Sequence, residues 1–410
     1  MSKLRAILSL ATALTSGACV ANALDGLDGT RDASVAFDAG ACTPVFEART
    51  LSVEDTGWPG WNGLVVDAGK LLMRVASGAR EPRVIYRDLV TSSERIEAEG
   101  VDAFVLGGRE GAFVLAGGGD RYEIWWGRHV STMQVQVEAL GDDDARPDLT
   151  VSFEGGVPQR VSANGAAYHI GGDLRWWRDG ILAVLPFGQV GSVAVTDDRL
   201  FYALRGRAGT SLVMVREPND PMETLVSGAE IITHIVATGD QVFYLAGASF
   251  MHLDLATRRV VTLDEGPCGP PSSSGGRAVA ACSDTGELYP ALGTHLTYFD
   301  GERTQRRVDD EGFYFAPRLV GTRVAWVHYP TAETPCMGSL DPVTEVRVAD
   351  LSRAEAPTVV GRTGAPCLCC GRLWAPVELG FDGAYVAFNY AGSPAVEHAV
   401  EVVRLDSECR

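Results

Sequence analysis

Eight times along the chain, a turn-forming pair of residues is followed by a short run of β-forming residues. The eight pairs begin at Ala68, Glu110, Asn164, Asp197, Gly239, Gly275, Gly321 and Asp382. Successive pairs lie on average about 45 residues apart, which is the length of one four-stranded blade of a β-propeller. The pattern therefore predicts an all-β fold, a β-propeller of seven or eight four-stranded blades.

One repeat shows the four strands of a blade with particular clarity. Residues 231–237 form a largely apolar run, interrupted by Thr233 and His234, and such a run is typical of a strand that is covered on both faces and lines the centre of a ring. Residues 241–246, 249–255 and 259–263 follow as further short strands, and the outer ones alternate between apolar and polar residues. This repeat therefore predicts one complete blade.

The last repeat has one strand too few. It offers strands at residues 374–380, 384–389 and 399–405, and only a few residues follow. An open sheet edge would expose unpaired backbone groups. We therefore expect residues 44–51, which alternate in polarity just before the first repeat, to complete the last blade and close the ring.

The segment Met251–Leu263, with the sequence MHLDLATRRVVTL, resembles the repeats of TolB-like propellers, in which a turn of the type DL-x-T-G precedes the outer strand. The resemblance extends over most of residues 55–410 but stays at the level of fold, because the Ser-Pro-Asp-Gly signature common in that family is absent here. TolB-like domains commonly have six blades, fewer than the eight turn pairs of this chain. The resemblance implies a scaffold for protein or ligand contacts and supplies no catalytic residue to carry over.

The N-terminus has the features of an export signal. Lys3 and Arg5 precede a short apolar run, and Ala21-Asn22-Ala23 offers a cleavage site. The alternative is a lipoprotein signal that ends before Cys19, which would then carry the lipid. Both interpretations place the protein outside the cytoplasm, in the periplasm, on the outer surface or in the medium.

Three parts of the chain follow from this reading. Residues 1–23 form the export signal. Residues 24–41, which are rich in Gly, Ala and Asp, are typical of a flexible tether. Residues 42–410 form a single propeller domain.

The net charge of the chain argues against a nucleic-acid partner. The 410 residues include 53 Asp and Glu but only 35 Lys and Arg, a formal net charge of −18. Binding to a phosphate backbone needs clustered Lys and Arg, so no nucleic-acid partner is expected. Apart from the alternative lipid anchor, no apolar run is long enough to reach across a membrane. We expect a monomer whose partner is a protein or glycan of the cell envelope.

Cysteine usage supports export. Eight cysteines remain once the first is removed or lipidated, and an even number in an exported chain favours disulfides. Cys268 and Cys282 flank the pair Gly275-Gly276, so we expect a local bond between them. Cys42 and Cys409 lie beside the two strands that close the ring, and we expect a bond that locks this seam.

The other four cysteines are Cys336, Cys367, Cys369 and Cys370. Four thiolates can hold Zn²⁺, but the spacing lacks paired C-x-x-C units, and export favours oxidation. We therefore expect two disulfides, in which Cys336 pairs with one of the other three, while a zinc or copper site and a reactive thiol are the alternatives. No metal or cofactor is predicted for the chain.

Candidate ligand contacts come from one histidine and two tryptophans. His234 lies in a predicted inner strand, which lines the channel; a structural role is the alternative. Trp125 and Trp176 each belong to a Trp-Trp pair whose members face opposite sides of a strand, so one of each pair can stack on a sugar or aromatic group, with packing between blades as the alternative. His252 and Asp254 are expected on one side of a strand as a hydrogen-bonded surface pair.

Catalytic signatures are missing from the sequence. The acidic run Asp142–Asp148 lacks the residue order of a calcium loop and is predicted to be a solvated loop. No nucleophile elbow, P-loop or dinucleotide fingerprint is present. Two inserts, residues 267–276 and 329–344, favour one specialised set of loops. The leading hypothesis is an exported, non-enzymatic propeller scaffold; the alternative is a glycan-active lyase or hydrolase that uses channel-lining His and Asp/Glu residues.

Overall fold

Short runs of β-branched and aromatic residues, separated by turns with Gly and Asp, fold this chain into antiparallel strands. The computed structural model describes residues 49–52 and, with gaps, residues 64–405; the longest gaps are residues 76–82, 107–111, 144–159, 285–292, 330–343, 364–378 and 390–398. In the part of the chain that is described, no helix is long and apolar enough to span a bilayer.

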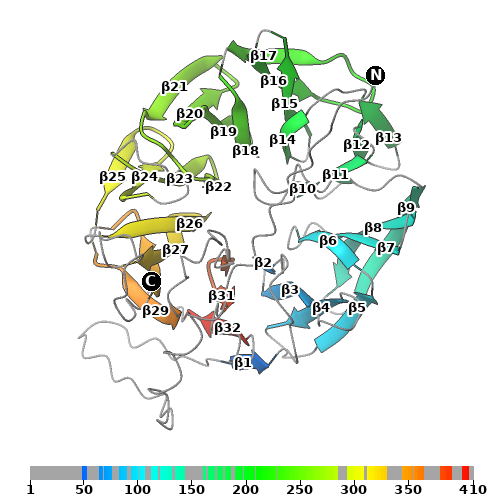
Figure 1. Ribbon diagram of the computed structural model, residues 1–410, viewed down its shortest axis with the longest axis horizontal. Coiled ribbons are helices and arrows are strands. Elements are labelled where there is room, and N and C mark those ends of the chain that lie inside the picture. Colours follow the sequence, from blue (N-terminus) through cyan, green and yellow to red (C-terminus); the bar gives the residue numbers. More distant parts are fainter. Residues whose placement is uncertain are drawn as a thin grey trace, which may run out of the picture.

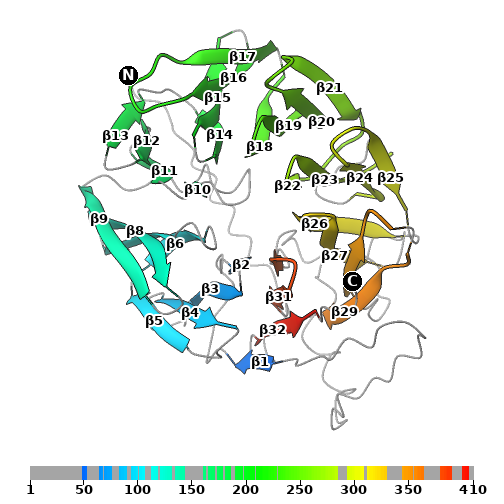
Figure 2. The same cartoon turned by 180° about the vertical axis from the view of Figure 1, so that it is seen from behind.

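The strands form four-stranded antiparallel sheets that stand around a common centre, as Figures 1 and 2 show from opposite sides. The described residues make eight such sheets, so the ring has eight blades, the larger of the two predicted numbers. In seven of them the strands pair in chain order, with the first strand innermost (Figure 1).

The first four blades run in chain order from β2 to β17. Their strands are β2 (Leu64–Asp67), β3 (Lys70–Val75), β4 (Arg83–Asp88) and β5 (Glu94–Glu99); β6 (Val101–Leu106), β7 (Ala112–Gly118), β8 (Arg121–Ser131) and β9 (Gln134–Asp143); β10 (Arg160–Ser162), β11 (Gly165–Ile170), β12 (Asp173–Arg178) and β13 (Ile181–Leu185); and β14 (Val190–Val195), β15 (Leu200–Gly206), β16 (Gly209–Val215) and β17 (Glu223–Gly228).

The remaining blades use β18 to β32 together with β1. Their strands are β18 (Ile232–Thr238), β19 (Gln241–Ala246), β20 (Ser249–Asp254) and β21 (Arg259–Asp264); β22 (Ser272–Ser274), β23 (Arg277–Cys282), β24 (His295–Phe299) and β25 (Thr304–Arg307); β26 (Phe313–Val320), β27 (Arg323–Tyr329), β28 (Thr344–Asp350) and β29 (Thr358–Thr363); and β30 (Leu379–Phe381), β31 (Tyr385–Asn389), β32 (Ala399–Arg404) and β1 (Arg49–Ser52).

The two ends of the described chain meet in the eighth blade, as the sequence predicts. Strand β1 pairs antiparallel with β32, with Arg49 opposite Val402 and Ser52 opposite Ala399. The N-terminal strand therefore supplies the outer strand that the last repeat lacks, so β32 has a partner on both sides and the two ends of the chain close the ring. Cys42 and Cys409, which are predicted to lock this seam, lie outside the described residues.

Blade five follows its predicted strands closely, and its second strand shows how the ring is held together. The interior residues of β19 are buried throughout, because the blade has a neighbour on each face. Val242 and Tyr244 face the apolar cluster shared with blade four, and Phe243 and Leu245 face the cluster shared with blade six. The period-two alternation of a strand thus divides its side chains between two interfaces.

Two loop predictions need correction. Strand β9 extends through Asp142 and Asp143, which lie opposite Glu123 and Tyr122, so the start of the acidic run is a strand and not a solvated loop. The long β8 strand provides enough partners to continue the ladder there. The predicted insert 267–276 contains β22, the inner strand of blade six, whose three serines gave no apolar signal.

Candidate functional site

The two ends of each blade differ in their connections. In an antiparallel meander, successive connections alternate between the two ends. One end therefore carries the turns between first and second and between third and fourth strands, and we call it the turn face. The other end carries the connections between second and third strands and between blades, and we call it the loop face.

Blades six to eight make this difference large. Their turn-face hairpins are short, as at Gly275–Gly276 and Gly321–Thr322. Four of the connections on their loop face are much longer and cover residues 283–294, 330–343, 364–378 and 390–398; the fifth, residues 308–312, is short. Loops on a rigid scaffold are where binding residues concentrate, so the loop face of these blades is the candidate functional surface.

The turn face is occupied by contacts that join neighbouring blades. The Arg199 guanidinium on blade four contacts Asp240 on blade five at 2.6 Å. The backbone amide of Gly69 on blade one donates to Asp382 on blade eight at 2.6 Å, and Arg323 on blade seven donates to the Gly383 carbonyl at 2.7 Å. These polar contacts link neighbouring blades at the rim of the turn face.

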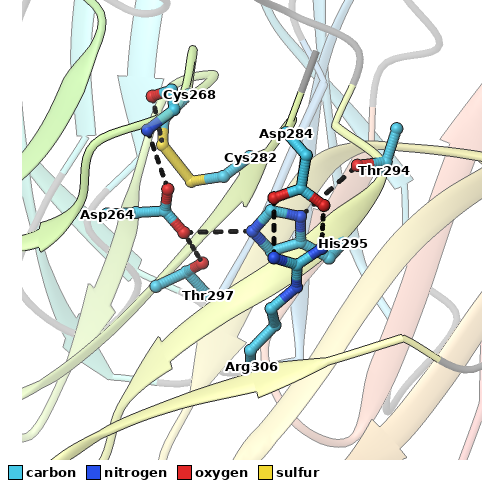
Figure 3. The surroundings of a disulfide bond; sticks show 9 residues. Asp264, Cys268, Cys282, Asp284, Thr294, His295, Thr297 and Arg306 are labelled. Atoms are coloured by element: carbon cyan, nitrogen blue, oxygen red, sulfur yellow. Dashed lines mark hydrogen bonds and ion pairs between the residues drawn. A yellow bond between two sulfur atoms is a disulfide. The ribbon is translucent and has the colours of Figure 1, made fainter.

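A polar cluster lies at the loop-face end of blades five and six. Asp264 is the last residue of β21, and His295 is the first residue of β24. His295 Nε2 lies 3.0 Å from Asp264 Oδ2, and the Thr297 hydroxyl donates to the same oxygen at 2.5 Å, as Figure 3 shows. His295 and Thr297 reach one carboxylate because residues two apart on a strand share a face.

Hydrogen bonds keep the Asp264 carboxylate ionised. Burial alone raises its pKa, but the hydrogen bonds from His295, Thr297 and the Gly266 backbone amide outweigh burial and bring the pKa to about 2. The His295 side chain is 0% exposed and that of Asp264 is 18% exposed, so solvent reaches the pair only through the carboxylate. A buried, paired carboxylate of this kind is a structural element as well as a candidate binding group.

An exposed ion pair lies beside this cluster. Arg306 holds Asp284 through both guanidinium nitrogens, with Nη1 2.6 Å from Oδ1 (Figure 3). The hydrogen bond from Arg306 lowers the pKa of Asp284. The two side chains are 57% and 48% exposed, so they offer both charges to a partner on the loop face.

The predicted disulfide between Cys268 and Cys282 is present beside Asp264, with a sulfur–sulfur distance of 2.07 Å (Figure 3). Backbone pairing brings the two residues together, since they form an antiparallel bridge. The Asp264 carboxylate and the two sulfurs all lie within 4.8 Å of one another. These are the donor atoms, among the described residues, that come close enough to hold a metal ion.

His252 lies in the interface between blades five and six. Its ring stacks on Phe243 at 4.9 Å and lies 4.5 Å from the Phe299 ring, while its Nε2 hydrogen-bonds the Gln241 amide oxygen. Burial lowers the pKa of His252, and the charge of Asp254 opposes this effect. The predicted surface pair with Asp254 is therefore wrong: His252 is 6% exposed, and Asp254 instead accepts a hydrogen bond from the Thr257 amide.

The structure gives different outcomes for the two tryptophans that are predicted to contact a ligand. Trp176 is fully buried in a cluster with Leu200 and Tyr202 of blade four, so the prediction of a stacking surface there is wrong, and packing between blades is its role. Trp125 lies in β8, and its side chain is not described. Cys336, Cys367, Cys369 and Cys370 lie outside the described residues, as does Cys19.

His234 lies on the inner strand β18, as predicted. The strand has a bulge between Thr233 and Val236, and His234 takes a left-handed backbone conformation there, with φ of 51°. Such a conformation is uncommon for a non-glycine residue and concentrates at functional positions. Ala316 repeats it, with φ of 50°, in the β26 bulge of blade seven, so the bulge is a feature of the repeat and no special mark of His234. A ligand contact of His234 stays a prediction.

Sequence reasoning missed Asp264, His295 and Thr297. Asp264 is more than thirty residues from the other two, and the three form no spaced motif. The available signal was the strand prediction, which places Asp264 directly after the outer strand 259–263 and shortly before Cys268. The partner strand β24 follows a connection whose length could not be inferred.

No protein-family model matches the chain, and no curated protein is similar to it in sequence. Solved structures resemble it in fold. They include a prolyl endopeptidase (TM-score 0.49, 11% identity, 84% of this chain and 55% of that one) and the β-propeller domain of the trilobed protease from Pyrococcus furiosus (TM-score 0.47, 10% identity, 73% of this chain and 98% of that one). TolB from Acinetobacter baumannii is a third (TM-score 0.36, 13% identity, 71% of this chain and 79% of that one).

These likenesses are confined to the β-propeller fold. The chain spans little more than half of the prolyl endopeptidase chain. Propellers carry many unrelated functions, so activity has to be argued from the site.

Proposed function

We propose that this chain is an exported, non-enzymatic propeller scaffold that binds a protein or glycan of the cell envelope through the loop face of blades six to eight. The observation that carries the proposal is the difference between the two faces. Short hairpins occupy the turn face, whereas the longest connections and the exposed pair Asp284–Arg306 belong to the loop face.

Export is the second part of the proposal. The basic and apolar N-terminus with its Ala-x-Ala site supports a signal over residues 1–23, with lipidation of Cys19 as its variant. The bond between Cys268 and Cys282 supports an oxidising compartment, because disulfides persist there and are rare in the cytoplasm. Residues 24–41 would then serve as the tether between the signal or anchor and the ring.

The test compares matched substitutions on the two faces of the mature chain. Asp284 and Asp240 are both exposed carboxylates, and each pairs with an arginine at 2.6 Å. Asp284→Lys on the loop face should weaken binding in a glycan array and in cross-linking to envelope proteins by about tenfold. Asp240→Lys on the turn face should leave binding unchanged.

A second loop-face variant tests a different connection, the one between β27 and β28. Replacing residues 330–343 by a two-residue turn should also weaken binding. If neither loop-face change affects binding, or if Asp240→Lys abolishes it, the loop face is not the interface. A hydrolase and lyase screen on the same protein completes the test: turnover that disappears in His234→Ala would replace the binding-only proposal by the enzymatic alternative.

A further inference from the structure

Backbone hydrogen bonds hold Cys268 and Cys282 next to each other without help from the bond between their sulfurs. The Gly269 amide donates to the Ala281 carbonyl at 2.8 Å, and the Ser283 amide donates to the Pro267 carbonyl at 2.9 Å. These bonds flank Cys268 and Cys282 on both sides. The two sulfurs would therefore stay close together if the bond between them were reduced.

We propose that the reduced protein binds one Zn²⁺ ion through the thiolates of Cys268 and Cys282 and the carboxylate of Asp264, with His295 as the fourth ligand. The first three donor atoms already lie within 4.8 Å of one another. His295 Nε2 lies 3.0 Å from Asp264 Oδ2. The imidazole is not one of the donors that lie within 4.8 Å of one another, so its ring has to turn toward the sulfurs to become the fourth ligand.

Three of the four donor atoms lie close enough together to converge on one tetrahedral ion. Zinc–oxygen and zinc–nitrogen bonds of about 2.0 Å and zinc–sulfur bonds of about 2.3 Å place neighbouring ligand atoms about 3.3 to 3.8 Å apart. The sulfurs, bonded in this structure at 2.07 Å, have to separate, which rotation of the two cysteine side chains allows. Asp264 Oδ2 and His295 Nε2 have to open by only a few tenths of an ångström.

The donor set selects the metal. Two thiolates exclude Ca²⁺ and Mg²⁺, which take oxygen ligands. The carboxylate disfavours Cu(I), which prefers thiolate and thioether sulfur, whereas Zn²⁺ accepts sulfur, nitrogen and oxygen together.

The surroundings are those of a closed, structural site. Cys268, Cys282 and His295 are buried, and the exposed edge of Asp264 provides the route of entry. Thr297 and the Gly266 amide hold the carboxylate in place at 2.5 and 2.9 Å, and Thr294 Oγ1 lies 3.4 Å from His295 Nδ1. Outer contacts of this kind orient the ligands of zinc sites.

The exchange between the two states balances with a dithiol as reductant. The dithiol transfers two electrons and two protons, the Cys268–Cys282 bond breaks, and the dithiol closes to its own disulfide. Zn²⁺ then displaces the two thiol protons. A small-molecule disulfide reverses the change: it accepts two electrons from the thiolates and becomes a dithiol, the Cys268–Cys282 bond forms again, and Zn²⁺ is released. The same two segments are therefore linked by the metal in one state and by sulfur in the other.

The experiment uses the mature chain with Zn²⁺ itself as the probe. The protein is reduced with dithiothreitol under nitrogen, desalted, loaded with Zn²⁺ and assayed for bound zinc by mass spectrometry. Because other cysteines are present, the measured quantity is the difference between variants. Wild type should hold one zinc ion per chain more than the variant with Cys268→Ser and Cys282→Ser, and the oxidised wild type should lack this ion.

Two further variants test the other ligands. Asp264→Asn and His295→Gln should each lower the affinity for this ion by on the order of ten- to a hundredfold. Asp284→Asn, a nearby carboxylate outside the site, should bind like wild type. Co²⁺ in place of Zn²⁺ should give a thiolate-to-metal absorption band that the cysteine variant loses.

Equal zinc content in reduced wild type and the cysteine variant would overturn the proposal, as would full affinity in both Asp264→Asn and His295→Gln. If circular dichroism shows that the double cysteine variant is unfolded, Cys268→Ser alone replaces it, with the same expected loss of one ion. These outcomes are independent of any partner on the loop face.

Discussion

Blade five meets its two neighbours in different ways. Its interface with blade four is a cluster of apolar side chains, among them Phe201, Leu212 and Tyr244. Its interface with blade six contains a histidine between two aromatic rings, a disulfide and the pair Asp264–His295. The same strand β19 serves both interfaces, because its side chains alternate between them.

The difference teaches what each kind of interface can do. An apolar interface is stabilised by burial, which depends little on pH or redox state. The interface with blade six depends on groups that titrate and on a bond that can be reduced. The stability of this interface therefore depends on the pH and redox state of the compartment. The interface also reaches the loop face, which we propose to bind a partner.

The largest expected effect comes from a substitution that disrupts the apolar interface between blades four and five. Phe201→Ala removes a fully buried ring between blades four and five, which should lower the free energy of unfolding by about 3 to 5 kcal/mol. Urea unfolding followed by tryptophan fluorescence measures the loss. Val184→Ala, at a side chain that is 48% exposed, should change stability by no more than about 0.5 kcal/mol. Equal effects of the two changes would contradict the assigned core.

The next effect acts on the interface with blade six. Replacing Cys268 and Cys282 by alanine opens a link between residues 14 positions apart, which should cost about 3 kcal/mol. The cost should vanish when both proteins are unfolded in a dithiol with a metal chelator present. If wild type keeps its advantage under those conditions, the stabilisation comes from something other than the bond.

Acid should weaken the same interface through Asp264. Its pKa of about 2 in the folded state lies below the ordinary value of 3.8, so the unfolded state takes up the proton first. The stability from this carboxylate is complete above pH 4 and is lost as the pH falls toward 2, about 2 kcal/mol in all. The difference in free energy of unfolding between wild type and Asp264→Asn should shrink over this range. A constant difference would show that the carboxylate is not held as described.

His252 should add a further loss nearer neutrality. Because burial holds its pKa below the ordinary 6.5, the unfolded state is protonated first as the pH falls, and stability declines from about pH 6.5 downward. The groups that face the ring are Gln241, Phe243, Phe299 and the charge of Asp254, which opposes the shift. His252→Leu should lack the decline between pH 7 and 5, measured by urea unfolding. An unchanged pH profile would place the titration elsewhere.

Much of the fold could be predicted from the sequence, because turn pairs and strand alternation are local signals. The blade-five strands, the closing strand next to β32 and the Cys268–Cys282 bond follow from such signals. The candidate site could not be predicted in the same way. Asp264 and His295 meet only because two blades pack together, and a pairing of that kind leaves no spacing in the chain.

Burial was also beyond local reasoning. Trp176 and Trp177 alternate across a strand, but nothing local says which side faces a neighbouring blade. His252 and Asp254 share a face in the pattern, and yet the histidine is enclosed by aromatic rings from two blades. A serine-rich inner strand such as β22 likewise gives no apolar signal; Ser272 and Ser274 accept hydrogen bonds from the amides of Leu319 and Gly321 in the next blade at 2.9 and 3.0 Å.

The smallest expected effect concerns the rim of the apolar interface, where Arg199 of blade four meets Asp240 of blade five on the turn face. The Asp240 side chain is 55% exposed, so solvent and salt screen the pair, and a double-mutant cycle with Arg199→Ala and Asp240→Ala should give a coupling of about 0.2 to 1 kcal/mol. The coupling should fall further in 1 M salt, because the screening length then drops to about 3 Å. The matched cycle on Arg306 and Asp284 of the loop face should give a similar small value. A coupling well above 1 kcal/mol for Arg199 and Asp240 alone would mean that the rim, and not the apolar cluster, holds blades four and five together.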